Sequence, residues 1–193
     1  ATVSGSLPFT PANWNSAQTV TVTGVNDNII DGTITSTITA EIVDVISDDN
    51  FDAVANQTVS ATTTDNDTAG FTVAQSGGST AVAETGTTDT FTVVLDAQPT
   101  SDVVISITSS DTSEATVSGS LTFTPANWNS AQTVTVTGVD DVTVDGTQTS
   151  TVTVSIIDAI SDNDFDAVAD QTVSVSTADN DVAGFTVTQS GGA

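Results

Sequence analysis

The chain of 193 residues contains no lysine, arginine or histidine, and its 25 aspartates and glutamates give it a formal net charge of -25. No side-chain salt bridge can therefore form within it. Proteins that bind nucleic acids or anionic membranes neutralise phosphate groups with lysine and arginine, so this composition excludes both kinds of partner. Metal cations are the counterions that such a surface favours.

Cysteine is also absent, which excludes disulfides and thiolate metal sites. Because histidine, lysine and tyrosine are missing too, the chain lacks most of the usual catalytic bases and nucleophiles, and we do not expect an enzyme. Paired carboxylates can hydrolyse glycosides, but the acids here occur in larger clusters that suit a metal better. No apolar run approaches the roughly 18 residues that a membrane span requires.

The residues that are present predict a folded protein, since 37% are hydrophobic and the mean hydropathy is +0.10. The stretch "LPFTPANWNSAQTVTVTG" at residues 7–24 returns almost unchanged at residues 121–138. Residues 1–79 align with 115–193 without a gap, and about three-quarters of the aligned positions are identical. The sequence therefore contains a tandem repeat with a period of 114 residues.

Within each repeat the apolar residues alternate with threonine and serine, as in "QTVTVTGV" and "TSTVTVSII", and this period of two predicts half-buried strands. Threonine favours strands and keeps the outer face polar. About seven such strands fit one repeat, which predicts an all-β fold of tandem immunoglobulin-like Greek-key sandwiches. The expected strands are residues 70–75, 90–96, 102–108, 115–124 with a break at Gly119, 132–139, 148–157 and 171–177.

The repeat boundaries predict three segments. Residues 1–68 form the C-terminal part of a preceding repeat, with four of its strands, residues 69–182 form a complete repeat, and residues 183–193 form the first strand of a following one. Neighbouring repeats of the same chain, or identical chains in a filament, are the partners that this organisation implies.

Acidic residues are concentrated in the loops that a seven-strand sandwich places at one end. Successive loops alternate between the two ends, so the loop after the first strand, the loop after the third, the loop after the fifth and the exit from the seventh all meet. Carboxylates about 5 Å apart repel by about 3 kcal/mol at an effective dielectric near 20. A divalent cation bound between them makes the electrostatic energy of the cluster favourable. These loops carry Glu84, Asp111, Glu114, Asp140, Asp141, Asp145, Asp179 and Asp181.

Calcium suits such loops better than magnesium, because it accepts 6 to 8 oxygen ligands in loose geometry. A single aspartate in a turn is explained by turn formation alone. Adjacent pairs such as Asp140 and Asp141 add nothing to a turn and repel each other, which favours the calcium interpretation for the set. The equivalent loops of the first copy contribute Asp27, Asp31, Asp65 and Asp67.

The run "AGFTVAQSGGSTAVAETGTTDTFTVVLDAQP", followed by "LTFTPANWNSAQTVTVTGVDD" and "DND", resembles the Calx-beta-like repeats of bacterial surface proteins and, more distantly, of sodium-calcium exchangers. The resemblance covers essentially the whole chain. It implies calcium ligands at Glu84, at Asp111 or Glu114, and at Asp140, Asp141, Asp145, Asp179 and Asp181. This chain departs from the family's all-acidic tail at Asn180, and the first copy has Asn26 in place of Asp140.

A second acidic loop, "SDNDFDAVAD", is expected at the opposite end of the sandwich. Its spacing is like the start of an EF-hand loop, but the glycine at position 6, the glutamate at position 12 and the flanking helices are missing. A weaker cation site and a solvated loop both remain open. The candidate ligands are Asp162, Asp164, Asp166 and Asp170, and chain direction predicts that Asp65 and Asp67 of the preceding copy lie near them.

Tryptophan occurs twice, in the two "PANWNS" turns, and we expect Trp128 to fold back over the open end of the sandwich, although an exposed aromatic ring could instead stack on a sugar. Together these features predict a calcium-binding structural repeat of a long extracellular bacterial surface protein, serving as a stalk, filament or adhesin shaft. The alternative is an adhesion module that binds a glycan or a partner at the cell surface.

Overall fold

The computed structural model describes residues 1–191 and divides the chain into two compact units, Ala1–Asp67 (unit 1) and Thr68–Ala193 (unit 2). No helix among the described residues combines the length and the apolar character needed to cross a membrane. The two units differ in how completely their strands are paired.

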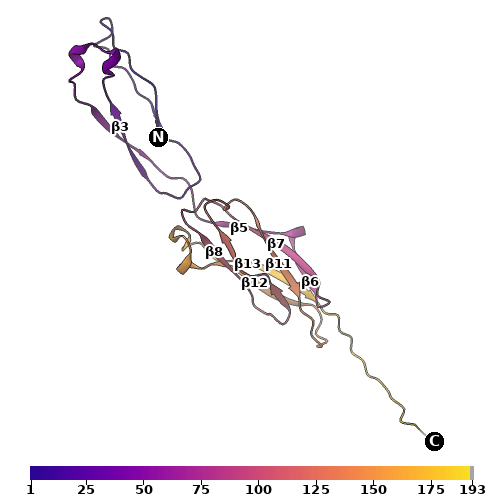
Figure 1. Cartoon of the computed structure of the whole chain (residues 1–193). Helices are drawn as coiled ribbons and strands as arrows, with labels where there is room; N and C mark the ends of the chain where they lie inside the picture. Colours follow the sequence, from indigo (N-terminus) through magenta and orange to yellow (C-terminus); the bar gives the residue numbers. More distant parts are fainter. Residues whose placement is uncertain (192–193) are drawn as a thin grey trace. The chain divides into compact units, whose positions relative to one another are not determined.

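Two packed sheets form unit 2 (Figure 1). The four-stranded sheet has the order β5-β7-β11-β9, and the five-stranded sheet has the order β10-β8-β12-β13-β6. All pairs are antiparallel except β13 with β6. The strands are β5 (Phe71–Gln75), β6 (Thr80–Ala83), β7 (Thr88–Leu95), β8 (Val103–Ser109), β9 (Ala115–Val117), β10 (Leu121–Phe123), β11 (Gln132–Gly138), β12 (Gln148–Ile156) and β13 (Gln171–Ala178).

The alternation of apolar and polar residues explains which face of each strand is buried. Every second side chain of β7, β8, β11 and β12 points inward, as Val93, Ile105, Val134 and Val152 show, and all four are fully buried. The threonines between them remain partly or fully exposed. The predicted all-β, immunoglobulin-like Greek-key fold is confirmed.

Strand β6 is the main addition to the predicted set of strands. It follows β5 after the short 3-10 helix η3 (Ser76–Gly78) and crosses to the other sheet, where it runs parallel to β13. The expected break at Gly119 separates β9 from β10, which also belong to different sheets. Because β6 ends at Ala83, it places Glu84 at the end of the sandwich where β13 exits.

The long loop between β12 and β13 folds into two 3-10 helices, η4 (Asp158–Ile160) and η5 (Asn163–Phe165), and Phe165 is fully buried. Trp128, in the turn between β10 and β11, is half-buried, so part of it remains in contact with solvent. Its carbonyl oxygen accepts a hydrogen bond of 3.2 Å from the backbone N–H of Leu95.

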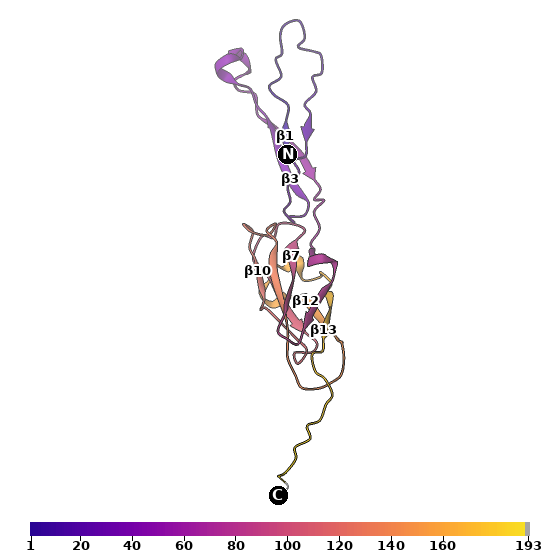
Figure 2. The ribbon, with the colours of Figure 1, turned by 90° about the vertical axis from the view of Figure 1, so that its right-hand side faces the viewer.

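Unit 1 consists of two separate strand pairs (Figure 2). β1 (Thr2–Val3) pairs with β2 (Val22–Thr23), and β3 (Ile34–Ala40) pairs with β4 (Gln57–Thr63). The loop between β3 and β4 contains the 3-10 helices η1 (Asp44–Ile46) and η2 (Asp49–Phe51). None of residues 1–67 is buried, so unit 1 has strand pairing without a core.

The expected strand of a following repeat forms no strand at residues 183–191, and residues 192 and 193 lie outside the described residues. The almost identical stretch at 71–75 is β5, which pairs with β7. The same local sequence is therefore a strand where a partner strand is available.

Candidate metal centre

Four segments of unit 2 bring carboxylates together at the end of the sandwich where β13 exits. One carboxylate oxygen each from Glu84, Glu114 and Asp141 lie within 4.8 Å of one another, and so do oxygens from Glu84, Asp179 and Asp181. Glu84 belongs to both groups. Glu84 follows β6, Glu114 precedes β9, Asp141 follows β11, and Asp179 and Asp181 follow β13. Residues nearly 100 positions apart in the sequence therefore lie close together.

Backbone pairing fixes the position of the two glutamates. The N–H of Glu84 donates to the carbonyl of Ala178 over 3.1 Å, which extends the parallel pairing of β6 with β13 by one residue. The carbonyl of Glu114 accepts from the N–H of Val139 over 2.9 Å. Both side chains are buried, with 2% of Glu84 and 7% of Glu114 exposed.

Asp179 holds the loop between β11 and β12 against the exit from β13. One of its oxygens accepts from the N–H groups of Asp145 and Gly146 over 3.1 and 2.7 Å, and the other accepts from the N–H of Asp181 over 2.6 Å. Gly146 has a φ of +74°, which glycine adopts without strain. These N–H groups, chiefly those of Asp181 and Gly146, hold the pKa of Asp179 below its usual value.

Burial and mutual repulsion act in the opposite direction on three neighbours. The pKa of Glu114 is raised by burial first and then by the charges of Asp145 and Asp141. Burial, followed by the charge of Asp179, also raises the pKa of Asp181. At Glu84 the N–H of Asn180 lowers the pKa, but burial and the surrounding carboxylates together outweigh it and raise the pKa overall.

Two buried oxygens in this cluster have no hydrogen-bond partner among the described residues, Oε2 of Glu114 and Oδ2 of Asp181. A buried carboxylate oxygen without a partner is costly, and the chain has no cationic side chain to neutralise it. A hard cation would satisfy both oxygens, so this set of donors fits a metal ion. Glu84, Glu114, Asp141, Asp179 and Asp181 are the residues placed to hold it.

The other predicted ligands of unit 2 surround this cluster without joining either group. Asp140 and Asp145 are exposed, and Oδ1 of Asp140 accepts from the side-chain amide of Asn180 over 2.8 Å. Asp111 is also exposed and closes its own loop, since Oδ1 accepts from the N–H and hydroxyl of Ser113. These hydrogen bonds lower the pKa of Asp111.

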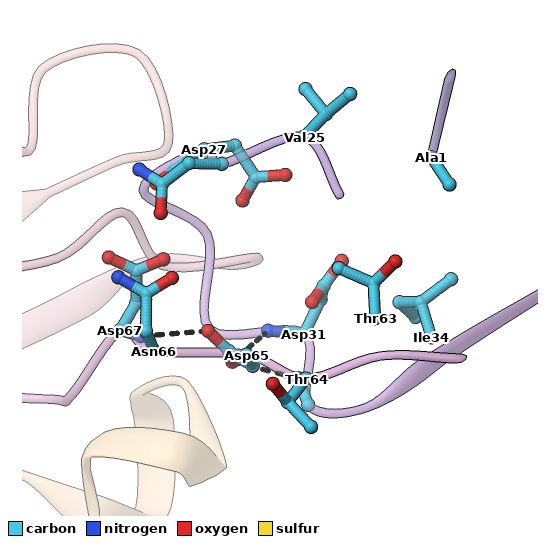
Figure 3. A pocket seen from close by; sticks show the side chains of 12 residues that line it. Ala1, Val25, Asp27, Asp31, Ile34, Thr63, Thr64, Asp65, Asn66 and Asp67 are labelled. Atoms are coloured by element: carbon cyan, nitrogen blue, oxygen red, sulfur yellow. Dashed lines mark hydrogen bonds between the residues drawn. The ribbon is translucent and has the colours of Figure 1, made fainter. Parts of the chain in front are cut away.

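Unit 1 contains the counterparts of three of the five residues of this centre (Figure 3). Oδ2 of Asp65 accepts from the N–H groups of Asp31 and Gly32, and Oδ1 accepts from the N–H of Asp67, as Asp179 does in unit 2. Asp27, Asp31, Asp65 and Asp67 line a hollow of about 140 Å³. Burial and the charges of Asp65 and Asp27 raise the pKa of Asp67. Residues 1–67 include no counterpart of Glu84 or Glu114.

The weaker candidates lie in the loop between β12 and β13, and the structure does not gather them into a group like those above, within the residues it describes. Asp162 is buried, and its Oδ2 accepts from the N–H of Thr100, the hydroxyl of Thr100 and the N–H of Ser101. Its Oδ1 accepts from the N–H of Asp164 and caps η5. Asp162 therefore fastens this loop to the loop before β8. Asp164, Asp166 and Asp170 are exposed.

Sequence reasoning missed the contribution of Asn180, whose backbone N–H donates to Oε2 of Glu84 over 3.0 Å. It also missed β6, which carries Glu84 into the centre. Two of the three buried residues here, Thr80 and Glu84, are polar, so the stretch lacks the alternation of apolar and polar residues that identifies a strand.

No protein-family model matches the chain, and no curated protein sequence matches it. Domains 4 and 5 of the S-layer protein SbsC are 25% identical over 65% of this chain, with a TM-score of 0.40, and the chain spans 54% of that structure's length. SbsC domains 4–9 are 26% identical over 71% of this chain and 18% of theirs, with a TM-score of 0.39. The apo-form Calx CBD1 domain is 14% identical over 57% of this chain and 98% of its own, with a TM-score of 0.41.

The raised pKa values of Glu84, Glu114 and Asp181 predict how stability depends on pH in the presence of a chelator. A carboxyl group with a raised pKa binds its proton more tightly in the folded state, so the free energy of unfolding rises as the pH falls through that pKa. Below the usual carboxyl range of about 4, groups with a lowered pKa, such as Asp179 and Asp162, reverse the trend. Urea unfolding in EDTA should therefore show greater stability near pH 5 than at pH 7.

The variant Glu114→Gln removes one of the three groups in the unit 2 cluster whose pKa is raised and should reduce this gain in stability. A free energy of unfolding that falls steadily from pH 7 to pH 4 in the native chain would contradict the prediction.

Proposed function

We propose that this cluster binds calcium through Glu84, Glu114, Asp141, Asp179 and Asp181. We further propose that the chain is a structural repeat of an extracellular surface protein, and that the bound ions stiffen its array of repeats. The observation that carries the proposal is the buried carboxylate of Glu114. One of its oxygens lies within 4.8 Å of oxygens of Glu84 and Asp141, and its Oε2 has no hydrogen-bond partner among residues 1–191. Three carboxylates in such proximity repel strongly unless a cation lies between them. The Calx-beta-like motifs of the sequence point to the same ion.

Calcium is favoured over magnesium by the ligands themselves. Five carboxylates from four separate segments offer up to ten oxygens, and the loops that carry them impose no octahedral geometry. Magnesium keeps several waters and binds through one or two carboxylates. Glu84 lies in both groups of three, so two ions could share it as a bridging ligand.

The position of Asp179 and Asp181 explains how binding would stiffen the protein. Both residues lie on the segment by which the chain leaves β13, and Asp65 and Asp67 occupy the same place immediately before Thr68, where unit 2 begins. An ion that joins the exit segment to Glu84 and Glu114 fixes the direction in which the chain continues. We propose neighbouring repeats as the partners, and a mechanical role without catalysis.

Calorimetric titration of the full chain with calcium tests the binding step. We expect saturable binding, and we expect Glu114→Gln to weaken the affinity by at least about tenfold, since even residues behind the ligands contribute that much in known metal sites. Glu41→Gln is the matched control, because Glu41 is exposed and belongs to unit 1. Absence of binding heat, or equal losses in the two variants, would refute the proposed centre.

Small-angle scattering tests the stiffening step separately. Saturating calcium should narrow the distribution of distances within the full chain relative to EDTA, and Glu114→Gln should reduce that change. If calcium binds but leaves the scattering unchanged, the proposed mechanical role is wrong, and only the proposal of a calcium-binding site is supported.

A further inference from the structure

The apolar residues that build the core of unit 2 are present in unit 1, but there they are exposed. Phe9 is 55% exposed, whereas its counterpart Phe123 is 0% exposed, and Val59 is 65% exposed against 1% for Val173. Phe51, the counterpart of the fully buried Phe165, is also exposed. The residue type is identical in each pair, so the difference lies in what covers these side chains.

The strands of unit 1 are already arranged like the corresponding strands of unit 2. Ile38 lies opposite Val59 in the β3-β4 pair, as Val152 lies opposite Val173 in the β12-β13 pair. Thr2 lies opposite Thr23 in the β1-β2 pair, as Thr116 lies opposite Thr137 in the β9-β11 pair. Each of these residues of unit 1 lies 114 positions before its counterpart in unit 2, so the strand register is the same in the two units. The strand faces whose counterparts line the core of unit 2 are therefore already formed in unit 1.

Unit 2 shows which strands lie beside those edges. β11 pairs with β7, β12 pairs with β8, and β13 pairs with β6. The counterparts β2, β3 and β4 lack these neighbours within unit 1. All three missing strands correspond to one contiguous stretch, Thr80–Ser109, and open strand edges beside exposed apolar residues are a template for pairing with another segment.

From these observations we infer that the apolar face of unit 1 is a docking surface for a polypeptide segment with the sequence pattern of residues 69–114, which would supply the counterparts of β5 to β8. The occupant is defined by its sequence pattern. Of its four strands, the counterparts of β7, β8 and β6 fit the edges of β2, β3 and β4, and the counterpart of β5 pairs with that of β7. The copy of this segment in the chain itself cannot serve, because it is already paired within unit 2. The inference does not depend on calcium binding.

The test fuses a second copy of residues 69–114 directly before Ala1 of the full chain. Glu84→Gln and Glu114→Gln are introduced into this added copy, so that docking adds no buried negative charge and requires no cation. We expect hydrogen exchange in EDTA to slow by at least about 100-fold for the backbone amides of residues 20–23 and 57–63, since a completed sheet opens only by cooperative unfolding. In the unmodified chain these amides should exchange rapidly.

A matched fusion carries Val93→Asp and Ile105→Asp in the added copy. Both positions are fully buried in unit 2, so the charged segment cannot pack and should give no protection. Failure of the intact segment to protect unit 1 would overturn the inference. Strong protection in the unmodified chain would also overturn it, and a dependence on protein concentration would then identify a second copy as the occupant.

Discussion

Removal of calcium is expected to lower the melting temperature of unit 2 by roughly 10 °C, whereas Glu114→Gln should melt at a higher temperature than the native chain in EDTA. Each site contributes about 2.7 kcal/mol when free calcium exceeds the Kd 100-fold, and one kcal/mol shifts the melting temperature of a domain this size by roughly 4 °C. In the chelator, the substitution replaces a buried carboxylate, whose Oε2 has no hydrogen-bond partner in the described part of the chain, by a neutral amide. The same substitution removes a ligand when calcium is present.

Differential scanning calorimetry in EDTA and in saturating calcium measures both effects. Glu41→Gln removes one charge from an exposed position in unit 1 and should behave like the native chain in both conditions. A melting temperature that is insensitive to calcium would contradict the proposed centre. A loss of stability in Glu114→Gln under both conditions would show that the glutamate has a structural role independent of any cation.

The sequence predicted the strands whose inward side chains alternate strictly. β7, β8 and β11 lie where the period of two placed them, because Phe91, Val93 and Leu95, and their equivalents, can be buried on one face only. The connectivity of a Greek-key sandwich also predicted which loops meet, and the structure brings Glu84 and Glu114 together with Asp141.

What could not be predicted depends on contacts between distant segments. The stretch at 71–75 is a strand beside β7, whereas its near copy at 185–189 is not, so the local pattern alone does not determine the structure. Asp162 is a candidate cation ligand in the sequence, and its burial depends on hydrogen bonds from residues about 60 positions earlier, which the acidic loop alone does not reveal. The burial of Glu84 similarly follows from β6 crossing to β13, which no local pattern reveals.

Gly138→Ala is expected to destabilise unit 2 by about 3 kcal/mol or more, since it forces backbone atoms apart in a packed interior. A Cβ atom at Gly138 would lie 2.1 Å from the carbonyl oxygen of Ala83, and backbone cannot rotate away as a side chain can. Gly138 ends β11 and Ala83 ends β6, so the added methyl group would displace β6 and the adjacent Glu84. Calcium affinity should therefore fall by at least about tenfold, as expected when a metal ligand is displaced.

Gly24→Ala provides the matched comparison, because Gly24 is the counterpart of Gly138 in a unit that lacks β6. The nearest atom to a Cβ there is Cγ2 of Thr63 at 3.4 Å, an ordinary contact. Neither glycine has a positive φ, so alanine restricts the unfolded chain equally at both positions, an effect of about 0.4 to 1 kcal/mol in favour of the folded state. The difference between the two variants thus isolates the close approach of β6 to β11.

Urea unfolding in a Trp14→Phe background, where the fluorescence of Trp128 reports on unit 2, measures this difference. We expect unit 2 to unfold at a clearly lower urea concentration in Gly138→Ala and at the native concentration in Gly24→Ala. Equal midpoints would mean that β6 does not lie against β11 as closely as the structure places it. In that case the position of β6 would no longer explain how Glu84 reaches Glu114 and Asp181. The metal centre would then require a different position for Glu84.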